Sequence, residues 1–268
     1  MTGEHFSEED FKKTVRKKTL KSFAWFFLFL LLCLSGWWWL MDQPKDAGAL
    51  KPLRTAMDAN EKIFSKVFSG SRLEPEYPKT EAVRRVRVNG KAGLKTSIDT
   101  ANWKLLVIRN ADISPVADTL VISLDEIKQL PKTEVVFNFK CIEGWSQITW
   151  WGGVRFSDFA AHYHLGTKSG NGPVKDKDDD LFSYAGLRTP DGEYYVGIDM
   201  PAMMHPQTIL CYEMNGAPLP LDQGAPLRLI IPVKYGIKHI KRIGTLFFSD
   251  SPPPDYWYER GYDYYAGL

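Results

Sequence analysis

Residues 137–146 read FNFKCIEGWS, and residues 150–153 read WWGG. The odd-numbered positions from Phe137 to Cys141 are apolar, whereas the two even-numbered positions between them are polar. Side chains two residues apart lie on the same face of a β-strand, so this alternation predicts a strand that turns its apolar face and the thiol inward. The cysteine would lie at the inner end of that strand.

Glycines and tryptophans surround this cysteine. Gly144 and the Gly152-Gly153 pair permit tight turns, or a close approach of the backbone to a bound group, and the three tryptophans at positions 145–151 can wall a pocket. A thiolate beside such a pocket indicates a metal site or a nucleophile. The pattern leaves one alternative open, because a lone cysteine on an apolar strand face is commonly a small buried hydrophobe.

Length and charge limit the class of protein. The chain has 268 residues, with 34 Lys and Arg against 32 Asp and Glu, and a formal net charge of +2. This length can bury one core beside a short appendage, and the balanced charge argues against a nucleic-acid-binding surface. The three cysteines, Cys33, Cys141 and Cys211, do not form a disulfide framework. A bridge between Cys141 and Cys211 is possible in an oxidising compartment, but it would consume the proposed ligand.

The N-terminal third divides into segments of different composition. Residues 22–41 carry no charge, and twenty helical residues span a hydrocarbon core of about 30 Å. The Lys and Arg residues within 1–21 keep the N-terminus cytoplasmic by the positive-inside rule. We therefore expect a basic cytoplasmic segment at 1–21, a transmembrane anchor at 22–41, a tether with a short amphipathic helix at 42–81, and a globular body at 82–268. A removed signal peptide is the alternative to a retained anchor.

Periodicity predicts the elements of the body. Ser123 and Glu126 have the spacing of a capping box at the start of a helix. Pro190-Asp191-Gly192 favours a tight turn between two strands. The predicted strands are 103–108, 119–124, 184–189, 193–198, 209–214 and 227–231, and the predicted helices are 125–130 and 156–163.

Other polar clusters have ordinary interpretations. The acidic run that ends the segment 166–180 lacks the spacing of an EF-hand and predicts a solvated loop. His162 and His164 lack a third zinc ligand at suitable spacing and are predicted on the surface, whereas Cys211 is predicted in the core and His205 in a hydrogen-bonded turn.

A basic loop follows the last of these strands. Residues 234–241 bring three lysines, a glycine and a histidine together. Ammonium groups and backbone amides could hold a dianionic phosphate there through charge-assisted hydrogen bonds. A solvated basic loop is the alternative.

Seven motifs, in this order and spacing, carry a resemblance to a known family. They are CIEGWS at 141–146, WGGV at 151–154, HPQT at 205–208, NG at 215–216, GAPLRL at 224–229, KYGIKHIK at 234–241 and WYERGYDYYAG at 257–267. Together they resemble the sulfite oxidase family of molybdopterin-dependent oxidoreductases, including bacterial relatives of the periplasmic methionine-sulfoxide reductase catalytic subunit. The resemblance covers residues 86–268. It implies an α+β fold, in which a β-rich, mixed-sheet molybdopterin domain follows one transmembrane helix.

The resemblance also implies a site. Cys141 matches the thiolate that ligates molybdenum and is the expected catalytic residue. The residues that match cofactor-binding positions of the family are Asn89, Thr189, Gln223, Arg228, His239, Ile240 and Lys241. For Asn89 and Thr189, ordinary roles at a turn and at a strand end remain open.

The implied chemistry is two-electron oxygen-atom transfer on a small substrate by a molybdenum-molybdopterin cofactor. No heme-attachment or iron-sulfur cysteine spacing occurs in the chain, so electrons would pass to or from an external partner, such as a cytochrome or a quinone-linked membrane protein. We expect a single-pass protein of the bacterial inner membrane with its catalytic domain in the periplasm. The chain ends soon after GYD at 261–263 without the family's immunoglobulin-like dimerisation domain, so a monomer is expected.

Three questions stay open at this point. Arg87, Arg155 and Arg188 are conceivable binders of an anionic substrate, and the pattern does not choose among them or among sulfite, a sulfoxide and other small S- or N-oxides. A non-catalytic, membrane-tethered binding module with a decayed cofactor site is an alternative function. A cysteine-nucleophile hydrolase is another, and it requires a histidine base beside Cys141.

Overall fold

The computed structural model describes residues 8–67, 73–112, 119–174 and 178–267. The chain forms two compact units, residues 1–56 and 57–268. Phe68 of the predicted amphipathic patch and part of the acidic run at 166–180 lie outside the described residues.

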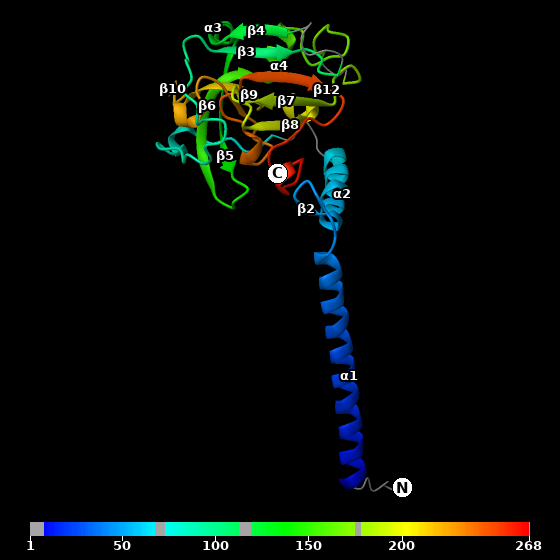
Figure 1. The fold of residues 1–268 in the computed structure, drawn as a ribbon. Helices are drawn as coiled ribbons and strands as arrows, with labels where there is room; N and C mark the ends of the chain where they lie inside the picture. Colours follow the sequence, from blue (N-terminus) through cyan, green and yellow to red (C-terminus); the bar gives the residue numbers. More distant parts are fainter. Residues whose placement is uncertain (1–7, 68–72, 113–118, 175–177, 268) are drawn as a thin grey trace. The chain divides into compact units, whose positions relative to one another are not determined.

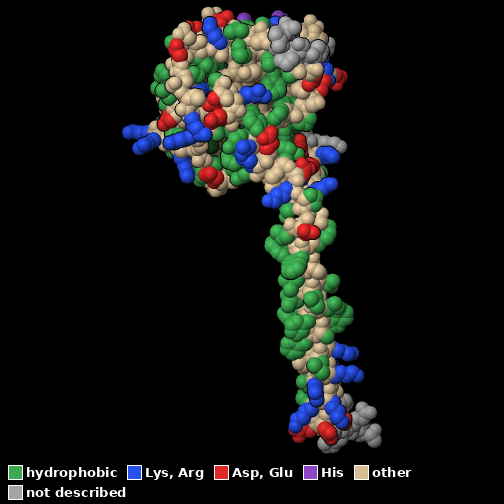
Figure 2. Space-filling view, viewed as in Figure 1, with side chains coloured by type: hydrophobic (Ala, Val, Ile, Leu, Met, Phe, Trp, Pro, Cys, Tyr) green, Lys and Arg blue, Asp and Glu red, His purple; other side chains and the backbone are tan. Residues whose placement is uncertain are grey.

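The first unit consists mainly of helix α1 (Glu8–Met41). Its most apolar 18-residue window has a mean hydropathy of 1.9, and the helix is long and apolar enough to cross a membrane by length and composition. Figure 2 shows hydrophobic side chains along this helix, with charged side chains gathered toward its N-terminal end. The helix begins earlier than the predicted span because the charged segment also favours helix, with Glu8–Lys12 and Glu9–Lys13 ion pairs one turn apart.

A short hairpin follows α1. It consists of β1 (Lys45–Asp46) and β2 (Ala49–Leu50) and leads directly into helix α2 (Lys51–Val67). This helix includes residues 63–67 of the apolar patch for which a short helix was predicted, and it begins twelve residues earlier than that patch. Ile63 on this helix is exposed.

The second unit contains two five-stranded sheets (Figure 1). One has the strand order β10-β9-β6-β5, with β11 also paired to β9, and the other has the order β4-β3-β12-β7-β8. The pairing of β12 with β3 is parallel, whereas the other pairs in the two sheets are antiparallel. The predicted α+β fold with a mixed sheet is confirmed.

The predicted strands fall close to their positions, whereas the strands at 146–155, 217–218 and 245–249 were not predicted. Their bounds are β3 (Lys104–Ile108), β4 (Thr119–Ser123), β5 (Lys132–Lys140), β6 (Ser146–Arg155), β7 (Tyr184–Arg188), β8 (Tyr195–Asp199), β9 (Ile209–Met214), β10 (Ala217–Pro218), β11 (Arg228–Ile230) and β12 (Thr245–Ser249). The helices are α3 (Leu124–Lys128), α4 (Phe156–His162) and α5 (Met200–Met203), with short 3₁₀ turns η1 (Lys79–Glu81), η2 (Leu221–Gln223), η3 (Gly236–Lys238) and η4 (Tyr258–Arg260). The capping box of Ser123 and Glu126 is present at α3.

The cysteine segment forms the turn of a long hairpin. Nine residue pairs join β5 to β6, and Cys141 is the first residue of the turn between them. The Cys141 backbone N–H donates to the carbonyl of Trp145, and Gly144 adopts a φ of 89°, a conformation that glycine tolerates best. The predicted strand therefore ends one residue before the thiol, and the turn fixes the thiol's direction.

Gly153 has a different role from the predicted one. A β-bulge lies between Gly152 and Gly153, and a Cβ at Gly153 would lie 2.1 Å from the carbonyl oxygen of Leu210. The glycine thus allows β9 to approach β6, and it is not among the residues that line the pocket described below. The expected approach of the Gly152-Gly153 backbone to a bound group is corrected to an approach of strand to strand.

Two apolar clusters form the core of the second unit. The larger one gathers residues of both sheets and of α3, α4 and α5, including Phe156, Phe159 and Phe248. The smaller one lies around β5, β6, β9 and β11 and contains Phe137, Trp151 and Cys211. Cys211 is fully buried, as predicted, and burial raises the pKa of its thiol to about 12. The cysteines are unbridged, so the alternative disulfide between Cys141 and Cys211 is not formed.

Candidate active site

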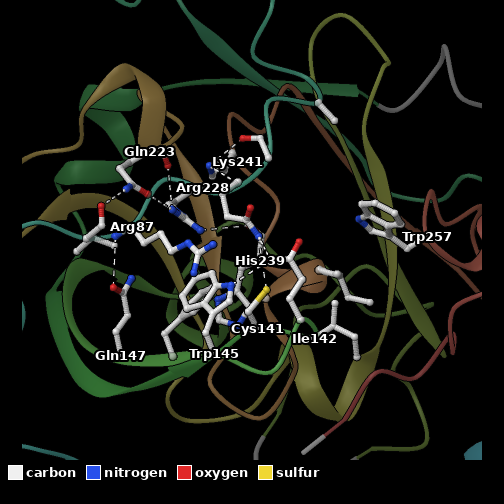
Figure 3. A pocket seen from close by; sticks show the side chains of 18 of the residues that line it. Arg87, Cys141, Ile142, Trp145, Gln147, Gln223, Arg228, His239, Lys241 and Trp257 are labelled. Atoms are coloured by element: carbon white, nitrogen blue, oxygen red, sulfur yellow. Dashed lines mark hydrogen bonds between the residues drawn. The ribbon is translucent and has the colours of Figure 1, made fainter.

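A pocket opens at the end of the β5–β6 hairpin, where four segments distant in sequence meet beside Tyr194 of the β7–β8 connection (Figure 3). The hairpin turn contributes residues from Cys141 to Trp145, and the segment before β3 contributes residues between Val86 and Ala92. The third segment runs from Gln223 to Lys241 and the fourth includes Trp257 and Tyr262. The pocket therefore gathers most of the motifs that the sequence singled out.

The thiol of Cys141 lies in this pocket and accepts a hydrogen bond from a neighbouring amide. Asn89 Nδ2 is 3.5 Å from Cys141 Sγ and 3.3 Å from Glu143 Oε2. Trp145 Nε1 donates to the same carboxylate oxygen at 3.1 Å. The carboxylate holds the amide in place, and the amide N–H can stabilise a thiolate, because a charged acceptor strengthens the hydrogen bond.

Arg228 is a buried cation without a described counter-ion. Its Nη1 donates to the backbone and side-chain oxygens of Gln223, its Nη2 donates to the carbonyl of His239, and its guanidinium stacks on Trp151. Within the described residues its buried Nε makes no hydrogen bond, and no carboxylate pairs with it. Burial lowers the pKa of Arg228 to about 10, so the group keeps its charge near neutral pH.

Lys241 adds a second positive charge to the pocket. Its ammonium group donates to the carbonyls of Asn89, Gly90 and Asp222, which ties the segment before β3 to η2. Burial, and next the charge of Arg228, lower the pKa of Lys241 to about 8. Two cations that repel each other in a buried pocket favour an anionic ligand.

His239 contributes a neutral ring to the pocket wall. Its Nδ1 accepts from the backbone N–H of Ile231, and its Nε2 lies 3.1 Å from the carbonyl of Lys234. A carbonyl only accepts, so the proton of the neutral ring is on Nε2. Burial, and next the charge of Arg228, lower the pKa of His239 to about 3, so the ring stays neutral at working pH. The ring also stacks on Phe137.

Five of the predicted cofactor-binding residues meet at this pocket, and two do not. Asn89, Gln223, Arg228, His239 and Lys241 line it. Ile240 is fully buried in the larger core cluster, and the Thr189 hydroxyl hydrogen-bonds within its own hairpin to Asp191 and Tyr194. The side chains of these last two residues are not among those that line the pocket.

The phosphate site predicted from three lysines needs correction. Lys234 pairs with Asp199 at 2.5 Å and Lys238 pairs with Asp255 at 2.6 Å, and both lysines are buried. These two ammonium groups are therefore neutralised by buried ion pairs within the protein. Of the three lysines, only Lys241 lines the pocket. The alternative of a solvated loop is also wrong, because the loop is largely buried.

The structure separates the three arginines considered as anion binders. Arg87 lines the pocket, with its guanidinium 4.7 Å above the ring of Trp145 (Figure 3). Arg155 precedes α4 and Arg188 ends β7, and both are exposed and outside the pocket lining. Spacing could not reveal this difference, because Arg87 reaches the pocket through the path of the segment before β3.

Sequence reasoning missed several other residues of the pocket. Glu143 stands two residues after Cys141, and its position in the same motif was the signal that could have found it. Trp257 and Tyr262 come from the closing motif, and their rings contact each other edge to face. Figure 3 draws Trp257 across the pocket from Arg87. Their role needed the tertiary structure.

The residues of the pocket fit a molybdenum-pterin group. A soft thiolate suits such a metal, and the buried guanidinium with its unpaired Nε suits an anionic organic ligand. Aromatic and apolar side chains around them can bury a planar ring system.

Comparisons with known proteins agree with this fit. Residues 92–257 match the family model described as the oxidoreductase molybdopterin-binding domain. The chain belongs to this family. The resemblance to the sulfite oxidase family is thereby confirmed, and the protein is a molybdenum-dependent oxidoreductase of that family.

Named relatives lie in the same family. The chain is 33% identical over 203 residues, 75% of its length and 70% of the relative's, to a putative protein-methionine-sulfoxide reductase subunit YedZ1 of Azospira oryzae. It is 31% identical over 188 residues, 65% of its length and 59% of the relative's, to the protein-methionine-sulfoxide reductase catalytic subunit MsrP of Campylobacter jejuni. The crystal structure of the sulfane dehydrogenase SoxCD from Paracoccus pantotrophus matches 68% of this chain and 46% of the SoxCD chain. Its TM-score is 0.46 and its sequence identity is 16%, so this likeness is too distant to support any conclusion.

Proposed function

We propose that this oxidoreductase catalyses two-electron oxygen-atom transfer on a small S-oxide and that Cys141 is the protein ligand of its molybdenum. The supporting observation is that one cavity is lined by the Cys141 thiol, by an amide that donates to it, and by three cations, Arg87, Arg228 and Lys241, that form no ion pair within the described residues. A metal-binding thiolate and an anion-binding wall are both required, and neither alone would support the proposal.

Each side chain has a distinct part in the proposed site. When bound, the molybdenum-pterin group supplies the two-electron oxygen-transfer chemistry. Cys141 would hold the metal, and Arg228, Lys241 and Gln223 would hold the anionic pterin portion. His239 would pack against it as a neutral ring. Roles for Thr189 and Ile240 remain predictions, and in this structure they act through the hairpin and the core.

Asn89 and Glu143 would tune the metal ligand. A hydrogen bond to a metal-bound thiolate withdraws charge from the sulfur and orients it. Glu143 fixes the amide of Asn89 through the 3.3 Å hydrogen bond that it accepts. This carboxylate lines the pocket and is also placed to exchange protons with a bound substrate.

An S-oxide is the substrate class that the pocket supports best. The relatives named above are methionine-sulfoxide reductase subunits by their names. The lining residues Trp257, Tyr262 and Ile142 are aromatic or apolar, and Figure 3 draws Trp257 across the pocket from Arg87. Thioether sulfur makes favourable contacts with aromatic rings. Arg87 on the opposite side can donate to a sulfoxide oxygen.

We further propose the cellular setting. Helix α1 would anchor the protein in a bacterial inner membrane, with the catalytic domain in the periplasm and as a monomer. A separate membrane protein or cytochrome would supply the electrons. The membrane-tethered module without activity remains the alternative if no molybdenum is bound.

The decisive experiment compares the wild type with Cys141→Ser after expression in a host that makes the pterin. We expect one molybdenum per chain and sulfoxide reduction for the wild type, and a folded variant without sulfoxide reduction. Cys33→Ser is the matched control, because Cys33 is exposed on α1, and it should behave as the wild type. Unchanged turnover by Cys141→Ser would exclude the proposed ligation, and absence of molybdenum from the wild type would favour the inactive module.

The hydrolase alternative lacks support from the described geometry. His162 and His164 are exposed, His205 is buried in a turn, and none of the three lines the pocket. His239 does line it, but its two ring nitrogens are engaged by the backbone. A histidine base beside the thiol is therefore not formed by the described residues.

A further inference from the structure

A basic surface strip runs beside the pocket. Residues 82–98 contain five Lys and Arg residues and no Asp or Glu. Arg84, Arg85 and Lys91 are exposed and form no described ion pair, and Lys95 pairs with Glu193. In Figure 2 Lys and Arg side chains project from the side of the globular unit on which Figure 1 draws this segment. We call residues 84–91 the basic strip.

The basic strip borders the pocket directly. Val86, Arg87, Asn89 and Gly90 line the pocket, and Arg85 and Lys91 are the chain neighbours of Val86 and Gly90. Consecutive Cα atoms are only about 3.8 Å apart, which places Arg85 and Lys91 at the rim.

Apolar groups are exposed at the same rim. Val88 is 43% exposed, and Ile142 and Tyr262 are each 37% exposed. Protein interfaces commonly combine apolar groups at the centre with charged groups around them. The acidic side chain that lines the pocket, Glu143, is held by Asn89 and Trp145. The rim therefore carries the three exposed cations Arg84, Arg85 and Lys91 against this one carboxylate, which makes it net positive and partly apolar.

We propose that the basic strip is the docking surface for a small electron-transfer protein with an acidic face. This inference rests on the proposed function. Reduction of a sulfoxide to a thioether and water consumes two electrons and two protons, so a reduced carrier must donate two electrons, one at a time, and becomes oxidised. The chain has no recognisable heme or iron-sulfur motif to relay them, so the carrier must approach the pocket itself.

The experiment measures the rate at which artificial donors reduce the metal in the molybdenum-loaded full chain, without sulfoxide. The donors are reduced anthraquinone disulfonate, an anion, and reduced methyl viologen, a cation. The test variant is Arg84→Glu/Arg85→Glu/Lys91→Glu, which leaves Arg87 in the pocket. The matched control reverses three exposed cations outside the pocket, in Lys104→Glu/Arg155→Glu/Arg188→Glu.

For the wild type we expect the anionic donor to react about tenfold faster at low than at high ionic strength, as in electrostatic steering. The test variant should lose this acceleration and favour the cationic donor, whereas the control should keep the wild-type preference. At high ionic strength the rates of all three proteins should converge. Equal responses of the test and control variants would overturn the docking surface, because the effect would then follow net charge.

Three further outcomes are informative. The full chain is placed in nanodiscs of neutral or anionic lipid, and acylation of Lys91 is measured. Protection of Lys91 in anionic but not neutral lipid would overturn the inference in favour of a lipid surface. A chain whose metal is reduced but does not reduce sulfoxide would refute the proposed substrate alone, whereas a chain without molybdenum would refute both proposals.

Discussion

Asn89 and Cys141 are 52 positions apart in the sequence, and the amide Nδ2 of Asn89 lies 3.5 Å from the sulfur of Cys141. The ammonium group of Lys241 donates to the backbone carbonyl of the same asparagine at 2.8 Å. The segment that contains Asn89 thus links the proposed metal ligand Cys141 to the cation Lys241. A substitution at either end of this link should affect the other end.

Asn89→Ala removes the donor to the thiol. We expect molybdenum content near that of the wild type and sulfoxide turnover lower by about 10–100-fold, as for other residues that orient a metal ligand. Metal analysis and steady-state kinetics measure the two quantities. Asn102→Ala, an exposed asparagine that bonds to Asp99, is the control and should leave turnover unchanged. Full turnover by Asn89→Ala would show that the amide does not tune the thiolate.

Arg228→Lys keeps the positive charge but loses the planar fork and the stacking on Trp151. We expect a folded protein that retains much less pterin and molybdenum. A lysine ammonium group cannot donate hydrogen bonds to Gln223, His239 and an anionic ligand at the same time. Fluorescence of the oxidised pterin released from purified protein measures the loss. Wild-type loading would contradict the assignment of Arg228 to the cofactor.

The low pKa of Lys241 predicts a pH effect in the cofactor-free protein. Between about pH 8 and 10.5 the unfolded chain binds a proton at this lysine that the folded chain has released. The free energy of unfolding should therefore rise with pH in this window, by at most about 1.4 kcal/mol per pH unit from this group. Lys241→Met should show a smaller rise.

Thermal unfolding at several pH values, followed by tryptophan fluorescence, measures this difference. Lys234, whose pKa burial also lowers to about 8, contributes equally to both proteins and cancels in the comparison. Lys104→Met, at an exposed lysine, is the control and should keep the wild-type slope. Identical slopes for the wild type and Lys241→Met would contradict the lowered pKa.

The buried ion pair of Lys238 with Asp255 predicts a large stability effect. Lys238→Met leaves the Asp255 carboxylate buried without its cation, at a cost of about 3–5 kcal/mol. The surface pair of Lys168 with Asp250 is 46% exposed at both side chains, so Lys168→Met should cost less than about 1 kcal/mol. Chemical denaturation of the cofactor-free proteins gives the loss in free energy of unfolding for each variant. Similar losses would show that burial of the ion pair does not determine its contribution to stability.

Much of the fold could be predicted from the sequence because its signals are local. Alternating polarity located the β5 strand, the spacing of Ser123 and Glu126 located the start of α3, and Pro190-Asp191-Gly192 located the β7–β8 turn. Each depends only on residues that are neighbours along one element. The role of Gly153 was missed because its partner, Leu210, belongs to a strand more than fifty residues away.

The lysines at 234–241 show where spacing fails. The sequence pattern could not show which of three lysines within eight residues faces the pocket, since each position of a loop can face the pocket or the core. Asp199 and Asp255, both distant in sequence, bind Lys234 and Lys238, and these pairs leave Lys241 at the pocket. Arg87 was likewise indistinguishable from Arg155 and Arg188 until the path of its segment was known.

The sequence alone determined the family, the strand that leads to Cys141, the burial of Cys211 and a helix long enough to cross a membrane. These follow from order, alternation and composition, which are properties of the chain before it folds. The tertiary structure decided which side chains meet at the thiol and which cations lack a carboxylate partner there. That outcome depends on how loops from different strands pack together, and the free energy of burying each charge depends on partners that no local pattern specifies.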